Sequence, residues 1–291
     1  MRPISQAHLL LLAAAYLHMP ARRLRALARG EDPSLEEWLG GESARKVAHA
    51  RHQAREAAAR LARIGAAILT IADAAYPAGL HDLEDPPALL FVRGTLPESG
   101  IAVVGSRTPP PEAAAFAREF ARLCAMPVVS GLASGIDAAA HHGALDARLP
   151  TLAYVGTGLG VTYPPEHLAL EEEIVARGGA VASERLPDEA VTKWALVHRD
   201  RLQAAHARAT VLVASEPDGG AMQTMAFAKV LGRPRFVLKA GSAPGYGGNA
   251  LAQREGAVAL PPDPQTAIET IAAALKKETA RANVRRARAA R

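Results

Sequence analysis

The hydrophobic residues between positions 101 and 260 form short continuous runs, separated by longer stretches with helical spacing. The runs occupy residues 101–104, 127–129, 151–155, 180–182, 210–214 and 235–238. Strands that are apolar on both faces, instead of alternating, are typical of a parallel sheet covered by helices on both sides. Two further apolar runs, at 67–71 and 89–92, are expected to extend this sheet. The pattern therefore predicts an α/β fold with a mostly parallel sheet and helices on both faces.

Both ends of the chain show helical patterns instead. Ser43 can cap a long run rich in Ala and Arg over residues 44–63. Near the C-terminus, a helix from Gln265 to Glu278 should precede an Arg-rich tail without fixed structure. We therefore expect three parts: a small helical domain over residues 1–65, the α/β domain over residues 66–262, and a C-terminal helix with a basic tail over residues 263–291. For the helical domain, a role in packing is favoured over a contact with a DNA backbone or a partner.

Residues 128–143 form the stretch with the clearest chemical signal. They read as a short strand, a glycine-rich turn and the start of a helix. Gly131 and Gly135 lack a Cβ atom, so the backbone can turn tightly and approach a ligand. The first N–H groups of a helix have no partner within it, and they favour a phosphate together with the helix dipole. A turn that only needs glycine to connect strand and helix is the alternative, and this loop alone does not decide between the two.

Three more turns of this kind follow other predicted strands. Gly105, Ser106 and Arg107 come after the run at 101–104, where the Arg107 guanidinium can grip a phosphate with two hydrogen bonds. The other two turns are Gly156-Thr157-Gly158, and Gly219-Gly220 with Thr224. Open parallel sheets bind ligands at the carboxyl ends of their strands. We therefore expect three of the turns, at residues 105–107, 131–135 and 156–160, to share one crevice.

Composition and charge only slightly narrow the classes of protein to which the chain can belong. Hydrophobic residues make up 49% of the 291 residues and charged residues 22%, which is typical of a globular protein. The net charge of +5 is compatible with a nucleic-acid partner. The single cysteine, Cys124, cannot form an internal disulfide bond, which favours a cytoplasmic protein and a role for Cys124 in the core. The apolar segment from His8 to Tyr16 is too short to cross a bilayer, so no membrane association is expected.

The segment Ser-Gly-Leu-Ala-Ser-Gly-Ile-Asp at residues 130–137, followed by His141, resembles the signature of the DNA-processing protein A family (DprA, also called Smf). Other landmarks occur in the order of the family: Asp85-Pro86-Pro87, Gly105-Ser106-Arg107, Gly156-Thr157-Gly158 with Tyr163-Pro164, Ser183-Glu184, Arg199 with Arg201, Gly219-Gly220 with Thr224, and Gly248-Asn249. The resemblance implies an extended Rossmann-like domain that binds single-stranded DNA and helps to load a RecA-type recombinase in transformation and recombination. It also implies a homodimer without enzymatic activity. The winged-helix domain that ends many family members is not expected here.

The resemblance implies roles for individual residues. Phosphate binding is expected from Arg107, Arg199 and Arg201, the last two on a basic helix over residues 197–208, for which a merely solvated face is the alternative. Where the family has an aromatic residue for base stacking, this chain has Leu196; Trp194 beside Lys193 is the candidate replacement, or else a core residue. This chain also differs from the family at two other positions. Asp200 stands where the family usually has Asn, and Ala214 stands where the family usually has an acid. The full set of candidates for binding DNA or phosphate is Gly105, Ser106, Arg107, Ser130, Gly131, Gly135, Gly156, Thr157, Gly158, Lys193, Trp194, Arg199, Arg201, Gly219, Gly220 and Thr224.

The alternatives to a DNA-binding protein are two classes of enzyme and a nucleotide-sensing protein. Phosphoribohydrolases of related fold carry Pro-Gly-Gly-x-Gly-Thr-x-x-Glu and need that carboxylate for glycosidic cleavage, but here Phe227 stands three residues after Thr224. A dinucleotide-binding enzyme is the second alternative. The turn Gly156-x-Gly158-x-Gly160 lacks the Gly-x-Gly-x-x-Gly spacing of a dinucleotide-binding loop. No cofactor is expected, and no metal, because Asp137 and His141 share a helix face without further ligands at suitable spacing.

One predicted helix near the end of the α/β domain has more apolar residues than one buried helix face needs: Met222, Met225, Phe227 and Val230. This excess favours a homodimer.

Overall fold

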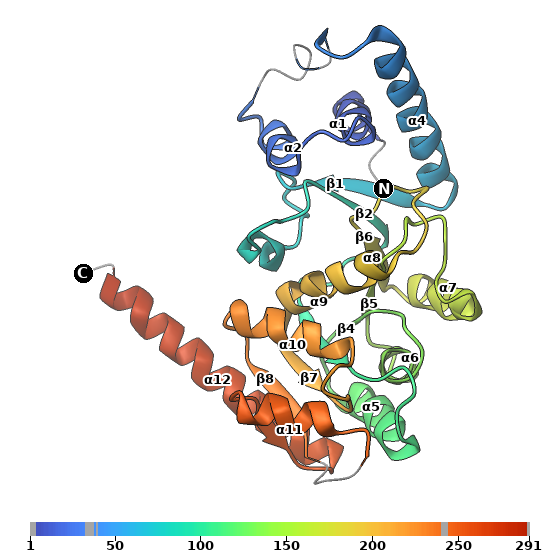
Figure 1. Cartoon of the computed structure of the whole chain (residues 1–291). Coiled ribbons are helices and arrows are strands. Elements are labelled where there is room, and N and C mark those ends of the chain that lie inside the picture. The colour runs from blue at the N-terminus through green and yellow to red at the C-terminus, as the bar shows by residue number, and fades with distance from the viewer. Residues whose placement is uncertain (1–3, 33–37, 39, 240–243, 290–291) are drawn as a thin grey trace. The chain divides into compact units, whose positions relative to one another are not determined.

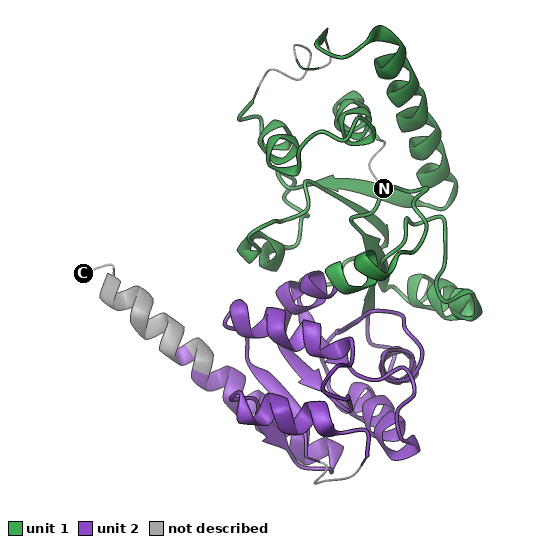
Figure 2. Cartoon of the chain, in the orientation of Figure 1, with its two compact units in different colours: residues 1–98, 152–199 green, residues 99–151, 200–291 purple. Residues whose placement is uncertain are grey.

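The computed structural model describes the backbone of residues 4–32, 38, 40–239 and 244–289; side chains 278, 279 and 281–289 are not described. The chain forms two compact units (Figures 1 and 2). Unit 1 contains residues 1–98 and 152–199, and unit 2 contains residues 99–151 and 200–291. Each unit is therefore assembled from two separate segments of the chain.

Four neighbouring strands form the sheet of unit 1, in the order β1 (Ala66–Thr70), β2 (Leu89–Gly94), β6 (Ala180–Ser183) and β5 (Thr151–Tyr154). β2 is antiparallel to both β1 and β6, whereas β5 and β6 are parallel. η1 (Ala78–Asp82) lies between β1 and β2, η2 (Pro165–His167) and α7 (Leu168–Ala176) lie between β5 and β6, and α8 (Lys193–His198) follows β6. The apolar runs at 67–71 and 89–92 do extend the sheet, as predicted.

The N-terminal residues of unit 1 are helical, as expected. They form α1 (Gln6–Tyr16), α2 (Ala21–Ala28) and α4 (Ala44–Arg63) (Figure 1). Ser43 caps α4, because its hydroxyl accepts a hydrogen bond from the Lys46 backbone N–H. The Tyr16 hydroxyl donates to Asp188 at 2.6 Å, which ties α1 to the loop after β6.

All five strands of unit 2 are parallel, in the order β4 (Val128–Ser130), β3 (Gly100–Val104), β7 (Ala207–Leu212), β8 (Arg235–Leu238) and β9 (Val258–Leu260). The helices are α5 (Pro111–Leu123), α6 (Ile136–Asp146), α9 (Asp200–His206), α10 (Ala221–Val230), α11 (Gly247–Arg254) and α12 (Pro264–Ala289). Side chains such as Val103, Phe120 and Val211 fill the core between strands and helices. The predicted α/β class with a mostly parallel sheet is confirmed.

Two helix predictions are wrong. The expected helix over 197–208 is divided: α8 ends at His198, α9 ends at His206, and Arg208 lies in β7. Residues from Ala207 onward pair with β3, and this burial outweighs their helical pattern. The tail expected to lack structure continues α12 as far as Ala289, because Ala and Arg are strong helix formers. The side chains of the tail arginines lie outside the described residues.

Among the described residues, none of the helices combines the length and the hydrophobicity that a membrane-spanning helix requires.

Candidate nucleic-acid interface

The candidate residues divide between the two units. Unit 1 holds Gly156, Thr157, Gly158, Lys193, Trp194 and Arg199, and unit 2 holds Gly105, Ser106, Arg107, Ser130, Gly131, Gly135, Arg201, Gly219, Gly220 and Thr224. We describe each group within its own unit, and the crevice shared by the turns at 105–107, 131–135 and 156–160 stays a prediction.

In unit 2, the turn after β3 packs closely against the turn that begins α6. The Ser106 backbone N–H donates to the Ala214 carbonyl at 2.7 Å, and the Ile136 N–H donates to the Ser106 carbonyl at 3.1 Å. Gly135 has φ +77°, and a Cβ there would lie 2.4 Å from the Ser106 oxygen. Gly105 is equally confined, because its Cβ would lie 2.6 Å from Ile136. The glycines therefore permit two strand ends to meet, and Arg107 emerges from the joint with an exposed side chain.

Some backbone N–H groups in the first turn of α6 already donate hydrogen bonds to carbonyl groups of the protein. Besides the Ile136 N–H, the Ala138 N–H is used, on the Ala133 carbonyl. The Asp137 carboxylate, which is buried, accepts a hydrogen bond from the Ala133 N–H at 3.3 Å. A carboxylate at this position itself interacts favourably with the helix dipole. The phosphate seat expected here thus already holds one negative group of the chain.

Ser130 and His141 are buried and hold neighbouring strands together. The Ser130 hydroxyl donates to the Val103 carbonyl at 2.7 Å, which joins β4 to β3. The Thr151 hydroxyl donates to the Val128 carbonyl at 3.0 Å and lies 2.7 Å from His141 Nδ1. Ser130 and His141 therefore have structural contacts inside unit 2.

The turn between β7 and α10 is open at one glycine only. Gly220 is exposed, and nothing lies within 4 Å of a Cβ built on it, whereas a Cβ on Gly219 would meet the Ser215 hydroxyl at 2.3 Å. Thr224 is buried. Two acidic residues of this turn, Glu216 and Asp218, are exposed. The edge of unit 2 that carries Arg107 is therefore not uniformly basic.

Asn249 organises this edge, although it was not among the candidate site residues. Its amide oxygen accepts from the Ser215 N–H at 3.1 Å, and its amide nitrogen donates to the carbonyls of Val213 at 2.9 Å and Leu238 at 3.0 Å. The side chain therefore fastens the ends of β7 and β8 to α11. The Gly248-Asn249 landmark in the sequence was the available signal, and burial of a polar side chain gives it a physical reason.

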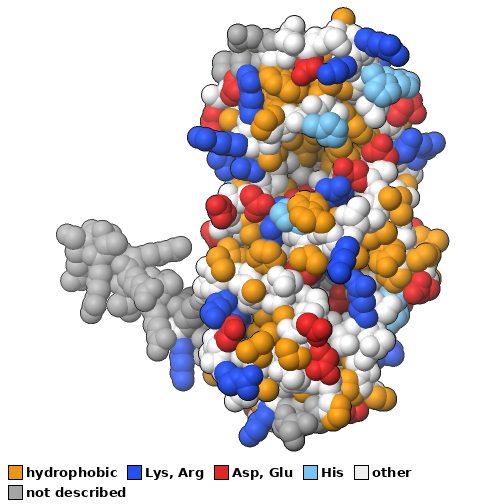
Figure 3. Space-filling view, viewed as in Figure 1, with side chains coloured by type: hydrophobic (Ala, Val, Ile, Leu, Met, Phe, Trp, Pro, Cys, Tyr) orange, Lys and Arg blue, Asp and Glu red, His pale blue; other side chains and the backbone are white. Residues whose placement is uncertain are grey.

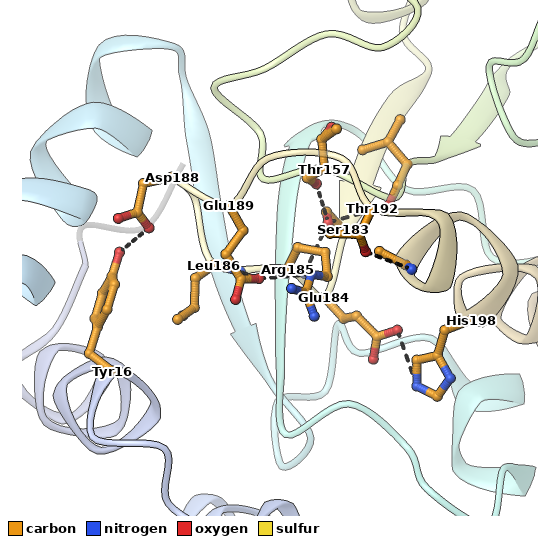
Figure 4. Close-up of polar contacts among 12 residues, drawn as sticks. Tyr16, Thr157, Ser183, Glu184, Arg185, Leu186, Asp188, Glu189, Thr192 and His198 are labelled. Carbon is orange, nitrogen blue, oxygen red and sulfur yellow. Dashed lines mark hydrogen bonds and ion pairs between the residues drawn. The ribbon is translucent and has the colours of Figure 1, made fainter.

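In unit 1, the Gly156-Thr157-Gly158 turn is buried against its neighbours. A Cβ on Gly156 would lie 3.0 Å from the Leu196 backbone nitrogen, so α8 rests on this turn. Thr157 donates its hydroxyl proton to the Val161 carbonyl at 2.6 Å. The Ser183 hydroxyl donates to the Thr157 carbonyl, also at 2.6 Å (Figure 4). The Gly158 N–H donates to the Glu189 carbonyl at 2.9 Å. These donors hold the turn itself together.

α8 presents an aromatic and cationic surface instead. Trp194 is 59% exposed, so it is not the core residue that was the alternative. Its ring stacks on His198 with 4.3 Å between centroids, and the Arg185 guanidinium lies 5.6 Å from the ring centre. Carboxylates flank these groups: His198 Nε2 lies 3.5 Å from Asp85. It also lies 3.8 Å from Glu184 (Figure 4).

The two candidate arginines beyond α8 are buried. Arg199 donates from its guanidinium to the backbone carbonyls of Leu196 and Tyr154. Arg201 is 3% exposed in α9. Asp200 accepts a hydrogen bond from the Gln203 amide at 3.1 Å. Both arginine side chains are buried in the structure. Their contacts with phosphate stay a prediction.

Within the described part of the chain, no cluster of three or more His, Cys, Asp or Glu side chains is arranged to hold a metal ion.

Comparison with known proteins places these observations in context. A family model described as DNA recombination-mediator protein A matches residues 67–272. The chain is 32% identical over 180 residues to protein Smf of Synechocystis, covering 58% of this chain and 45% of that protein. It is 34% identical over 176 residues to DNA processing protein DprA of Streptococcus pneumoniae, covering 58% of this chain and 61% of the relative. These alignments thus span about half to three fifths of the relatives' length.

Two solved structures are similar over most of their length. The X-ray structure of DprA from Streptococcus pneumoniae matches with a TM-score of 0.66 and 26% identity, covering 91% of this chain and 93% of that one. A structure of the Helicobacter pylori protein, described for its single-stranded DNA binding mode, matches with a TM-score of 0.63 and 26% identity, covering 71% of this chain and 95% of that one.

Proposed function

This chain belongs to the DNA recombination-mediator protein A family, and from that premise we propose that it binds single-stranded DNA and is a recombination mediator, not an enzyme. The observation that carries the proposal is the exposed ring of Trp194, inside the region that the family model matches. Lys193 precedes it in the chain, and Arg185, which is paired with Glu189 at 2.8 Å, lies over the ring. An exposed aromatic ring among cations is a platform on which an unpaired base can stack while its phosphate is neutralised. The relative from Helicobacter pylori, described as binding single-stranded DNA, supports the same partner.

On this proposal, the two units contribute different contacts. Unit 1 offers the stacking surface of α8, and unit 2 offers Arg107 and the open turn at Gly220. Contacts of this kind grip the backbone and base faces without reading sequence. Arg199 supports the stacking surface, because its guanidinium donates to the backbone carbonyls of Leu196 in α8 and of Tyr154.

A titration at several salt concentrations tests the proposal. Labelled single-stranded oligonucleotides and matched duplexes are mixed with the full chain, and binding is followed by fluorescence anisotropy. We expect tighter binding of the single strand, with an affinity that falls linearly on a double-logarithmic salt plot as counterions are released. Equal affinity for both forms, or no dependence on salt, contradicts the proposal.

We further propose that the protein delivers the strand to a RecA-type recombinase in the cytoplasm, in transformation or recombination. The family assignment supports this role. The measurement is recombinase ATP hydrolysis on DNA that is already coated with single-strand-binding protein. Addition of this protein should shorten the lag before hydrolysis, and an unchanged lag would exclude loading.

The absence of enzymatic activity is part of the proposal. Its reason is Phe227, which stands where phosphoribohydrolases carry their catalytic Glu. Nucleoside monophosphates incubated with the homogeneous protein should yield no free base by chromatography. Base release that co-purifies with the protein would restore the enzymatic alternative.

A further inference from the structure

The positive charge of this chain is concentrated in two short segments. The whole chain has 34 Lys and Arg against 29 Asp and Glu. Six basic residues and one acid, Glu56, lie in the 20 residues of α4, and five arginines without an acid lie in the last eleven residues. The remaining 260 residues therefore carry 23 basic against 28 acidic side chains. Outside these two segments the protein is net negative by five charges.

This distribution bears on how a polyanion is held. Single-stranded DNA gains most of its affinity from cations that replace condensed counterions. The turns proposed to contact DNA lie in the net negative part of the chain, and Glu216 and Asp218 are exposed beside Gly220. A strand bound there gains from further cations elsewhere on the protein.

α4 provides such cations on a rigid element. Its buried side consists of Ala50, Ala54, Ala57, Ala58 and Leu61. These residues recur every three or four positions, so they form one stripe that packs against the rest of unit 1. Every basic residue of the helix is exposed: Arg45, Lys46, Arg51, Arg55, Arg60 and Arg63. His49 and His52 are exposed as well.

The exposed side of α4 has the dimensions of a strand-binding surface. Twenty helical residues extend for about 30 Å. Arg51 and Arg55 are one turn apart, about 6 Å along the axis, and both line an open groove beside the helix. Lys46 is paired with Glu42 at 3.5 Å, which is a weak surface ion pair that a phosphate can replace. Figure 1 shows α4 at the border of the N-terminal region beside α1, and in the same view cationic and histidine side chains lie along that border (Figure 3).

We propose that the exposed face of α4, defined by Arg45, Arg51, Arg55, Arg60 and Arg63, is a second binding surface for the phosphate backbone of single-stranded DNA. This inference rests on the proposed function, since it assigns a further contact to the same ligand. The arginines bind phosphates and not base edges, so the surface adds affinity without sequence preference. The N-terminal helices thereby act as more than a cover for the sheet.

A charge-matched pair of variants tests the surface. In the first, Arg45→Gln, Arg51→Gln and Arg55→Gln are combined; Gln keeps a helix propensity close to that of Arg. In the control, Arg118→Gln, Arg122→Gln and Arg148→Gln remove three exposed arginines from unit 2, so both proteins lose the same net charge. We expect the α4 variant to bind oligothymidylate about 10- to 100-fold more weakly at low salt, with a salt slope smaller by about 2. The control should remain within a few-fold of the wild type.

Chemical footprinting on the wild-type protein gives a readout that does not depend on variant folding. Lys46 should become protected from acetylation when oligothymidylate binds, whereas the exposed Lys276 on α12 should not. Mass spectrometry after short exposure to the reagent reports both residues.

The outcomes separate the two proposals. If the wild type binds the single strand but the α4 variant behaves like its control and Lys46 is not protected, the α4 surface is wrong and the proposed function stands. If the wild type does not bind single-stranded DNA, the proposed function fails first. If the α4 variant loses only duplex or acidic-peptide binding, the surface belongs to a different ligand and the assignment is overturned.

Discussion

Arg107 emerges exposed from the joint between the β3 turn and the start of α6, so it can be removed without disturbing the core. We expect Arg107→Ala to weaken single-stranded DNA binding by a similar factor for every sequence tested, because a phosphate contact carries no base information. The salt slope should fall by about 0.7. Arg122→Ala, an exposed arginine of α5, is the matched control. A defect confined to particular sequences would contradict the phosphate role.

Trp194 differs from Arg107 in that its contribution should be insensitive to salt. Truncation to Ala should cost about 1–3 kcal/mol of binding, which corresponds to a loss of about 5- to 150-fold. Trp194→Phe keeps an aromatic face on α8 and should retain most of the affinity. Anisotropy titrations of both variants at high and low salt provide the comparison. Equal losses for Phe and Ala would show that stacking is not the source.

Cys124 lies buried at the end of α5, and this burial raises the pKa of its thiol to about 11. At pH 8 only about one thiol in a thousand is then ionised, against a substantial fraction in an unfolded chain. Alkylation by iodoacetamide should therefore be slow in the folded protein and fast in urea. Because the folded pKa is raised, the associated stability is complete below the unfolded pKa and is lost as the pH rises toward 11. Fast labelling of the folded protein would contradict this environment.

At the level of elements, the contact between the β3 turn and α6 depends on two confined glycines, Gly105 and Gly135. Gly135→Ala forces a Cβ into positive φ and to 2.4 Å from a carbonyl oxygen, so it should destabilise the protein by about 2–4 kcal/mol. Gly178, with φ +83° and no atom within 4 Å of its Cβ position, isolates the backbone cost, which should be about 1 kcal/mol. Thermal or urea unfolding of both alanine variants measures the difference. Equal losses would mean that the turn yields easily.

The strands could be predicted well from the sequence because most of them are apolar on both faces. The run at 235–238 coincides with β8, and those at 101–104 and 180–182 differ from β3 and β6 by one residue. β9 was missed, because Val258 is 48% exposed and the strand is only three residues long. The division between α8 and α9 was also missed, since burial of Asp200 and Arg201 is decided by tertiary contacts and not by helical spacing.

The candidate site was less predictable than the fold. Glycine turns at strand ends are visible in a sequence, but whether a turn is open depends on what packs on it. Gly220 is open, whereas Gly156 lies under the backbone of α8. In the same way, the sequence cannot distinguish Arg107, which is exposed, from Arg199, whose guanidinium is spent on backbone carbonyls.

At the level of the whole molecule, the homodimer stays a prediction with a concrete surface. Val230 at the end of α10 is 86% exposed, and Phe227 is half-buried on the same helix, whereas Met225 is buried in the core. If α10 joins two copies, Val230→Asp should convert a dimer into a monomer without loss of thermal stability. Val161→Asp, another exposed valine, is the control. Light scattering that gives a monomer mass for the wild type would remove the dimer.

The interleaved segments of the two units have a consequence for synthesis on the ribosome. β2 pairs with β6, with Phe91 opposite Ser183, so β2 must wait for about 90 further residues before its partner exists. At about 5–20 residues per second, this delay is roughly 5–18 s. During that interval the edge of β2 that pairs with β6 is unpaired in the nascent chain, where it can be captured by chaperones or by another chain. Slow codons between residues 95 and 180 should therefore lower the yield of folded protein more than slow codons after residue 200.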